Sequence, residues 1–148
     1  TPYTNLAEPN ETNTTDFTIW CNQSRMGSDA SYRQSAGTIT TNYMPLAAGD
    51  TIRIKGLVID ATSTNMNNGS IALWHGDPRG TTGSSDRGGV AHFSDCVTNG
   101  WFTISGSAQD GYTLVFDKDR TDIKFFRITA ALTGAANDVI ITANEDFT

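Results

Sequence analysis

Four residues beside one predicted strand have side chains that suit carbohydrate binding. Trp74 lies near the end of a short apolar run, and His75, Asp77 and Arg79 follow closely. A Trp ring can offer its face to a sugar, while carboxylate, imidazole and guanidinium groups hydrogen-bond to sugar hydroxyls. These four residues are the first candidate ligand site. Burial in a core remains the more common fate of a Trp.

A second aromatic group repeats this chemistry further along the chain. Trp101 follows Asn99 and Gly100, so an indole ring stands next to a small polar turn. We predict that Asn99 and Trp101 form the second candidate ligand contact, with core packing again the alternative for the ring. Ligand sites commonly combine an aromatic platform with a few placed polar groups.

The sequence offers little for catalysis. His75 lies near Asp77, and His92 lies near Asp95, so each histidine could be half of an acid–base pair. A nucleophilic site also needs a third orienting group, and no Gly-X-Ser-X-Gly motif occurs. The three glutamates all lie near the chain ends: Glu8, Glu11 and Glu145. We therefore expect a protein that is not an enzyme.

Three aspartates form the only metal candidate. Asp117, Asp119 and Asp122 lie in one predicted turn, with Lys118 and Arg120 between them. Calcium takes carboxylate and carbonyl oxygens, but this spacing is not that of an EF-hand loop. Alternating charges favour a solvated turn, so we expect no cofactor and keep calcium at this turn as the alternative.

The stretch Gly37–Asp60 is predicted to be the hairpin that organises the fold. Ile52 and Ile54 alternate with Arg53 and Lys55, which predicts one buried and one exposed strand face. After the lysine, a glycine breaks this phase, and the next apolar residues continue with the opposite parity. A glycine at such a switch indicates a bulge or a close backbone approach.

The rest of the chain favours an all-β fold. We expect further strands at 17–21, 70–75, 90–94, 97–105, 111–117, 123–132 and 138–143. No segment has a convincing helical period, and Gly or Asn stands at most joints. This pattern predicts an antiparallel β-sandwich, with a jelly roll as the first choice. An immunoglobulin-like sandwich is the second, because Cys21, Trp74 and Cys96 imitate its Cys–Trp–Cys order.

Two segments are expected to be irregular. Residues 1–16 are polar and without a period, so we predict a linker or lead-in before a single domain at 17–148. The stretch Gly76–Gly89 is rich in Gly and has no aliphatic or aromatic residue. Polar connections of this length tend to be functional or mobile, so this loop is predicted to be the most mobile internal segment.

Composition limits the partners. The formal net charge is −6, and a negative chain repels phosphate backbones, which disfavours nucleic acid. No apolar run approaches the roughly 18 residues of a membrane span, so we expect no membrane insertion. Hydrophobic content is low at 37%, and Thr, Asn, Ser and Gly make up the shortfall instead of charged residues, as is typical of extracellular or virion β-proteins. Cys21 and Cys96 could form one disulfide or stay free thiols.

Four segments carry a resemblance to a known family. Thr40–Gly56 reads TTNYMPLAAGDTIRIKG and resembles a segment of bacteriophage tail-fibre, baseplate and minor structural proteins that typically reads TNYIPVKAGDVIRIKG. The resemblance extends to NLAEP at Asn5–Pro9 with Ser24–Gly27, and to DVIITANE at Asp138–Glu145. It is patchy between residues 62 and 111. These motifs have no catalytic content, so they imply a domain type and not a reaction.

Three functions fit these observations. The resemblance implies a non-catalytic module of a phage virion appendage, which we expect to bind a receptor or carbohydrate on the host cell surface. A purely structural decoration or spacer domain, with another virion protein as partner, fits the strand pattern equally well. A carbohydrate-binding module of a secreted bacterial enzyme is the third. In each case the location is the virion or the extracellular space, and a homo-oligomer is possible.

Overall fold

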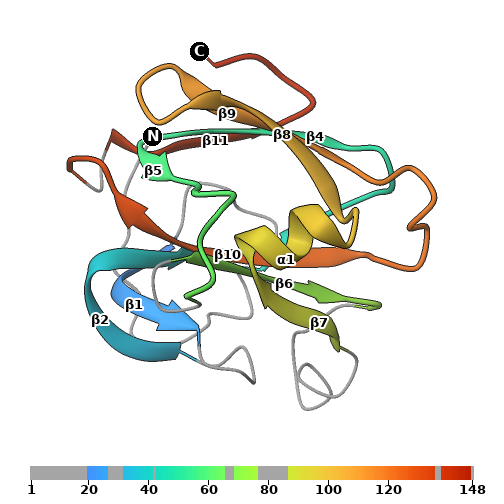
Figure 1. The fold of residues 1–148 in the computed structure, drawn as a ribbon, viewed down its shortest axis with the longest axis horizontal. Helices are drawn as coiled ribbons and strands as arrows, with labels where there is room; N and C mark the ends of the chain where they lie inside the picture. Colours follow the sequence, from blue (N-terminus) through green and yellow to red (C-terminus); the bar gives the residue numbers. More distant parts are fainter. Residues whose placement is uncertain are drawn as a thin grey trace.

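The protein folds into two antiparallel β-sheets that face each other. The computed structural model describes residues 20–26, 32–41, 43–65, 69–76, 87–135 and 138–147. In Figure 1 the strands β4, β8, β9 and β11 form the upper layer, and β1, β2, β6, β7 and β10 form the lower one. The predicted antiparallel β-sandwich is therefore confirmed. The expected lead-in at 1–16 lies outside the described residues.

The larger sheet is built around one central strand. Its order is β1-β2-β10-β6-β7, and β3 and β5 also pair with β10. The strands of this sheet are β1 (Trp20–Met26), β2 (Tyr32–Thr41), β3 (Met44–Pro45), β5 (Leu57–Val58), β6 (Gly69–Trp74), β7 (Arg87–His92) and β10 (Phe125–Leu132).

The smaller sheet has four strands in the order β11-β4-β9-β8. They are β4 (Thr51–Lys55), β8 (Phe102–Ser107), β9 (Gly111–Phe116) and β11 (Ile140–Ala143). Ile52 and Ile54 are fully buried between the sheets, whereas the Lys55 side chain is exposed and Arg53 is partly exposed. The alternation read from the sequence is thus confirmed on β4.

The predicted hairpin in Gly37–Asp60 is wrong. The strands β2 and β4 belong to different sheets and do not pair with each other. Residue alternation shows which face of a strand is buried, but it does not identify the partner strand. The segment therefore supplies one strand to each layer instead of two neighbours within one layer.

Gly56 is the point where the chain changes sheets. The strand β4 pairs in the small sheet, and β5 pairs with β10 in the large one. Gly56 has φ +94°, and a Cβ there would lie 3.0 Å from the Cα of Val139. The close backbone approach predicted from the phase break is confirmed, and only glycine meets both demands without strain.

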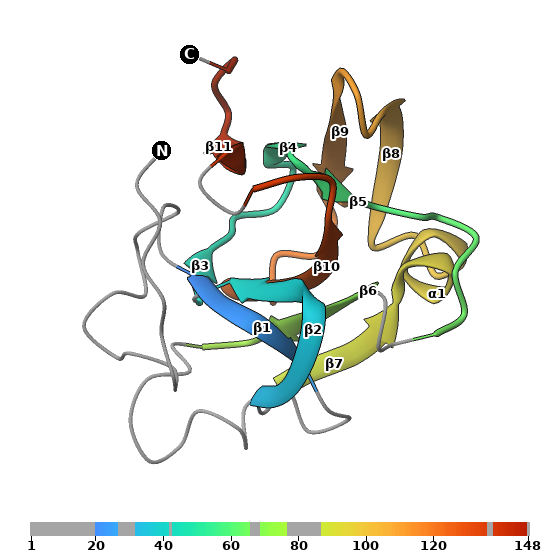
Figure 2. The same cartoon turned by 90° about the vertical axis from the view of Figure 1, so that its left-hand side faces the viewer.

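One short helix interrupts the strands. The helix α1 (Phe93–Thr98) lies where the sequence predicted the end of one strand and the start of another. Figure 2 shows it between β7 and β8, the edge strands of the two sheets on that side. Gly69 leaves room for its Phe93 ring, which a Cβ at that position would strike.

Residues 22–26 and 32–36 belong to β1 and β2, although no strand was expected there. Residues of β1 pair with β2 in an antiparallel hairpin whose register shifts between Asn22 and Ser24. Its residues are mostly polar, so they lack the apolar alternation on which strand prediction depends. The further strands expected along the chain match β6, β7, β9, β10 and β11 within a few residues.

Candidate functional site

Trp74 belongs to a core and not to an open surface. Its side chain is 2% exposed and packs with Met26 and Ala72 in a second cluster, on the opposite face of the large sheet from the main core. The Tyr43 ring meets it edge-on, with centroids 5.2 Å apart. Every residue of β6 is buried, so the end of this strand exposes no platform. Of the two roles considered for Trp74, the structure supports core packing.

A buried cation accompanies this second cluster. Arg127 on β10 is fully buried, and its Cζ lies 3.8 Å from the centroid of the Tyr43 ring and 6.0 Å from that of Trp74. Aromatic faces attract a guanidinium group through their quadrupole, more strongly where water is excluded. The group of Arg127, Tyr43 and Trp74 is therefore a packing feature inside the protein, and the candidate ligand site lies elsewhere.

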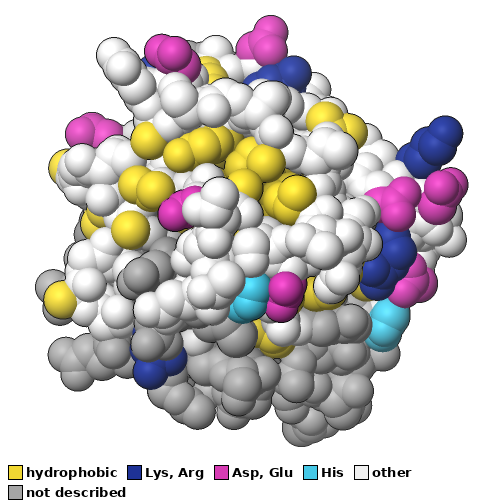
Figure 3. Space-filling model, viewed as in Figure 1, with side chains coloured by type: hydrophobic (Ala, Val, Ile, Leu, Met, Phe, Trp, Pro, Cys, Tyr) yellow, Lys and Arg dark blue, Asp and Glu magenta, His cyan; other side chains and the backbone are white. Residues whose placement is uncertain are grey.

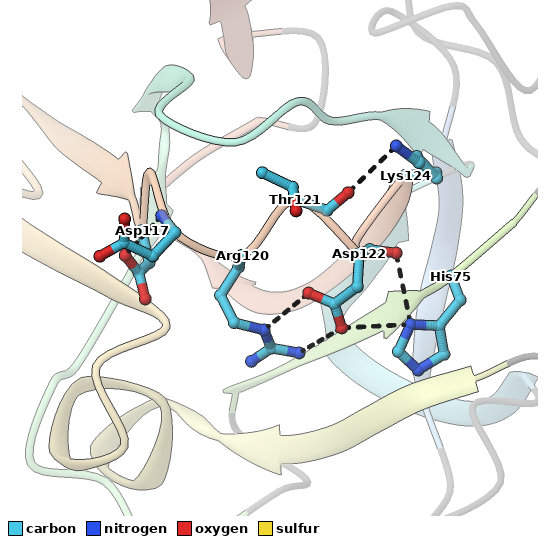
Figure 4. Close-up of polar contacts among 7 residues, drawn as sticks. His75, Asp117, Arg120, Thr121, Asp122 and Lys124 are labelled. Atoms are coloured by element: carbon cyan, nitrogen blue, oxygen red, sulfur yellow. Dashed lines mark hydrogen bonds and ion pairs between the residues drawn. The ribbon is translucent and has the colours of Figure 1, made fainter.

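His75, the next residue along the chain, is exposed and reaches the loop between β9 and β10. Its Nδ1 lies 3.3 Å from an Asp122 carboxylate oxygen and 3.3 Å from the Asp122 backbone oxygen. Arg120 donates to the same carboxylate from Nε at 3.1 Å and from Nη2 at 3.4 Å. Figure 4 shows the three side chains joined in a row, with Asp122 in the middle.

This network changes the acidity of Asp122. The hydrogen bond from Arg120 holds the pKa of the Asp122 carboxyl below its ordinary value of 3.8, with smaller electrostatic contributions from Arg120 and His75. Hydrogen bonds and positive charge both favour the ionised carboxylate. Asp122 therefore stays charged at neutral pH and holds Arg120 in a defined orientation.

Arg120 also borders the pocket that contains Trp101, here called the Trp101 pocket. Three of its lining residues carry a polar or charged group: Trp101, Asp117 and Arg120. Its cavity volume is about 10 Å³, room for one group the size of a water molecule. Six apolar residues complete the lining: Leu46, Ala47, Ala48, Leu73, Phe116 and Ile123.

The half-buried Trp101 ring is positioned by the end of helix α1. Gly100 has φ +75°, its N–H donates to Val97 O, and the Trp101 N–H donates to Cys96 O. These two bonds form a Schellman motif, the usual way in which a glycine ends a helix. The Trp101 carbonyl then accepts from the Asp117 N–H at 3.0 Å, which ties the aromatic residue to the loop carrying Arg120.

The structure thus brings two of the six predicted site residues to one loop. His75 and Trp101 come from different elements and both lie beside residues of the segment 117–122. Asn99 forms the C-cap of α1 and does not line the pocket. Asp77 and Arg79 lie outside the described residues, as does most of the stretch 76–89 whose mobility was predicted.

Sequence reasoning missed Arg120 as a site residue. The signal was present, because Arg120 stands between Asp117 and Asp122 in a turn that was interpreted as a solvated turn, with calcium binding as the alternative. Within the described part of the chain, no group of three His, Cys, Asp or Glu residues could hold a metal ion. Here Asp122 contacts a cation of the chain itself, and Asp117 accepts the Asp119 N–H at 2.9 Å.

The second histidine caps the helix. His92 Nδ1 accepts from the Asp95 N–H at 3.3 Å and lies 2.9 Å from Ser94 Oγ, while Nε2 lies 3.0 Å from Asp95 Oδ2. Three neighbouring residues of one helical turn make all of these contacts, which satisfy a backbone N–H that the helix start leaves unpaired. Figure 3 shows both histidine side chains at the surface, each beside an acidic group.

A second hollow lies at the opposite end of the small sheet. It has a volume of about 300 Å³ and is lined by Lys55, Gly56, Ala108, Gln109, Thr133 and Asp138. Its side chains are polar or small, and none is aromatic. It is wide and open, so the Trp101 pocket offers the better-defined combination of apolar surface and charge.

Cys96 is a free thiol buried in the main core, so it forms no disulfide with Cys21. Burial raises the pKa of the Cys96 thiol. A neutral thiol is a poor nucleophile, so Cys96 has a packing role.

Comparisons with known proteins found no relative of this chain. No family model, curated protein or solved structure matches the chain. Within the described residues, no helix has the length and apolar character needed to cross a bilayer.

Proposed function

We propose that this domain is a non-catalytic module of a phage virion appendage that binds carbohydrate on the host cell surface. The observation that carries the proposal is the half-buried Trp101 ring at an apolar pocket bordered by Asp117 and Arg120. The phage assignment itself comes from the motif in Thr40–Gly56 and its three companion segments at Asn5–Pro9, Ser24–Gly27 and Asp138–Glu145.

The Trp101 pocket has the elements that sugar recognition needs. An indole face packs against the C–H side of a sugar ring, and a carboxylate and a guanidinium serve its hydroxyl groups as acceptor and donor. Asp122 orients Arg120 before any ligand arrives, which lowers the entropy cost of binding. Of the six candidate residues from the sequence, Trp101 is kept as a ligand contact, and His75 is kept as a neighbour of Asp122.

The expected affinity of one module is weak. A shallow site that contacts a single sugar binds near millimolar, or about −4 kcal/mol. Several copies on one appendage would then engage one cell surface together and multiply this affinity without any new contact. A closed homo-oligomer such as a dimer or trimer would supply these copies.

The test is a glycan array probed with a multivalent form of the domain, followed by NMR titration of the monomeric domain with any ligand found. Trp101→Ala should lower the affinity at least about tenfold. This loss is comparable to that seen when an aromatic side chain that stacks on a nucleic-acid base is replaced by Ala. Thr103→Ala, an exposed position on neighbouring β8, is the matched control and should bind like the parent. A Trp101→Ala variant that folds and binds normally would move the site elsewhere.

A structural virion module without a ligand is the second candidate. It is favoured by the outer face of the small sheet, where Val115 is the one large apolar side chain exposed among the described residues. The neighbouring Thr103 and Thr113 share this face by register. Failure of every glycan to bind, together with self-association that Val115→Asp abolishes, would favour this candidate. A catalytic domain in the same full-length chain would favour the enzyme-linked carbohydrate module instead.

A further inference from the structure

We propose that the Trp101 pocket takes the acetamido group of an N-acetylated amino sugar. This inference rests on the proposed function, because it names the class of sugar for the same site. It comes from three properties of the pocket: its size, its apolar lining and the pair of opposite charges at its border.

Size and lining select a methyl group. The cavity of about 10 Å³ is close to the smallest that holds one water-sized group, so no substituent larger than a single methyl group can enter. Six of its nine lining residues are apolar, Leu46, Phe116 and Ile123 among them, so a hydroxyl or a water inside finds polar side chains only on the side of Asp117 and Arg120. A methyl group loses no hydrogen bond there. An unsubstituted hexose offers only hydroxyl and hydroxymethyl groups, whereas an acetamido substituent ends in a methyl.

The charged pair matches the amide that carries this methyl. An amide has one N–H donor and one carbonyl acceptor, and Asp117 and Arg120 supply an acceptor and a donor. Asp117 uses Oδ1 to accept the Asp119 N–H, which leaves Oδ2 for a ligand. Arg120 binds Asp122 through Nε and Nη2, which leaves Nη1 on the fixed guanidinium plane.

The aromatic member completes the match. The Trp101 ring is partly exposed at the same pocket, and the Schellman motif at Gly100 fixes the position of the Trp101 backbone. A sugar whose acetamido group enters the pocket would place its ring against the indole. Methyl, amide and sugar ring would then each meet a group of matching chemistry.

The experiment is an NMR titration of the whole domain with four separate probes: N-acetylglucosamine, glucosamine, glucose and the 6-deoxyhexose rhamnose. We expect N-acetylglucosamine to bind about tenfold more tightly than the other three. The largest shifts should fall on the Trp101 indole N–H and the Ala48 amide. Rhamnose tests the methyl alone, and glucosamine tests the amino sugar without its acetyl group.

Two variants test whether the preference for N-acetylglucosamine arises in the Trp101 pocket. Ala48→Leu should fill the cavity and abolish the preference for N-acetylglucosamine, and Asp117→Asn should reduce it while keeping the acceptor for the Asp119 N–H. Asp119→Asn in the same loop is the control and should bind like the parent. The comparison of the four probes on the parent protein needs no variant, so a misfolded variant does not decide the test.

The outcomes separate this inference from the proposed function. Binding of glucose or rhamnose at Trp101 as tightly as N-acetylglucosamine would overturn the acetamido assignment and leave sugar binding in place. Absence of any shift with all four probes, together with a blank glycan array, would overturn both.

Discussion

Asp122 is the residue on which the geometry of the candidate site depends. It holds Arg120 through two hydrogen bonds and contacts His75 on its other side. Because its folded pKa lies below 3.8, the ionised carboxylate stabilises the fold at pH values above about 4. This contribution is lost as the pH falls through the folded pKa.

Replacement of Arg120 should reveal this coupling. Arg120→Gln removes the charge and the main hydrogen bond, so the pKa of Asp122 should rise toward its ordinary value. The side-chain carboxyl carbon of Asp122, followed by NMR between pH 2 and about 6, gives both values. Arg53→Gln, which removes a guanidinium of β4 that contacts Asp146 instead, should leave the titration of Asp122 unchanged. An unaltered pKa in Arg120→Gln would show that Arg120 does not hold the carboxylate.

Neighbouring residues of β4 test the burial pattern. Ile54 is fully buried and Lys55 is exposed. Ile54→Ala should lower the free energy of unfolding by about 2–5 kcal/mol, because it leaves a cavity in the core. Lys55→Ala should cost under about 0.5 kcal/mol, as for an ordinary surface site. Denaturant melts measure both, and equal effects would contradict the assigned faces.

At the scale of elements, helix α1 shows where prediction from sequence fails. Phe93 and Cys96 are its buried residues, and a single pair three residues apart is too little to establish a helical period. The better signals were at its ends, where Asp95 stands in the first turn and Gly100 ends the helix. Trp101 was chosen as a candidate by its residue type, but its position depends on this unpredicted helix.

The Schellman motif should matter for both stability and binding. Gly100→Ala forces a residue with a Cβ into φ +75°, at a cost of about 1–2 kcal/mol, with no atom within 4 Å of the added Cβ to add a clash. Gly134→Ala is the matched control, because Gly134 has equal free space and no positive φ. Thermal or denaturant melts should show a loss for Gly100→Ala alone. The same variant should shift the Trp101 indole signal in NMR spectra.

At the scale of the molecule, the sandwich could be predicted but its connections could not. The alternation in β4 identified its buried face correctly, because one face of this strand lies in the main core. The strand β6 is buried on both faces, which decides for core packing of Trp74 over the candidate ligand site beside the polar loop. The pairing of Thr40 with Thr129, 89 residues apart, leaves no local trace in the sequence.

Gly56 offers a test of the connection between the sheets. Gly56→Ala would meet a positive φ and the Val139 backbone, whereas Gly37→Ala meets a positive φ of similar size in open space. Gly37→Ala should therefore cost about 1–2 kcal/mol, and Gly56→Ala clearly more. Chemical denaturation of the two variants measures the difference. Equal losses would mean that the approach of Val139 adds nothing.

The central place of β10 has a consequence for the time course of folding. This strand pairs with β2, β3, β5 and β6, so the large sheet stays incomplete until a segment near the end of the chain arrives. During synthesis the edges of β2 and β6 that pair with β10 should therefore stay exposed until β10 has been synthesised. Closing such distant contacts costs loop entropy first, so refolding should take milliseconds to seconds. Chaperone capture should accordingly be strongest for nascent chains that stop before Phe125.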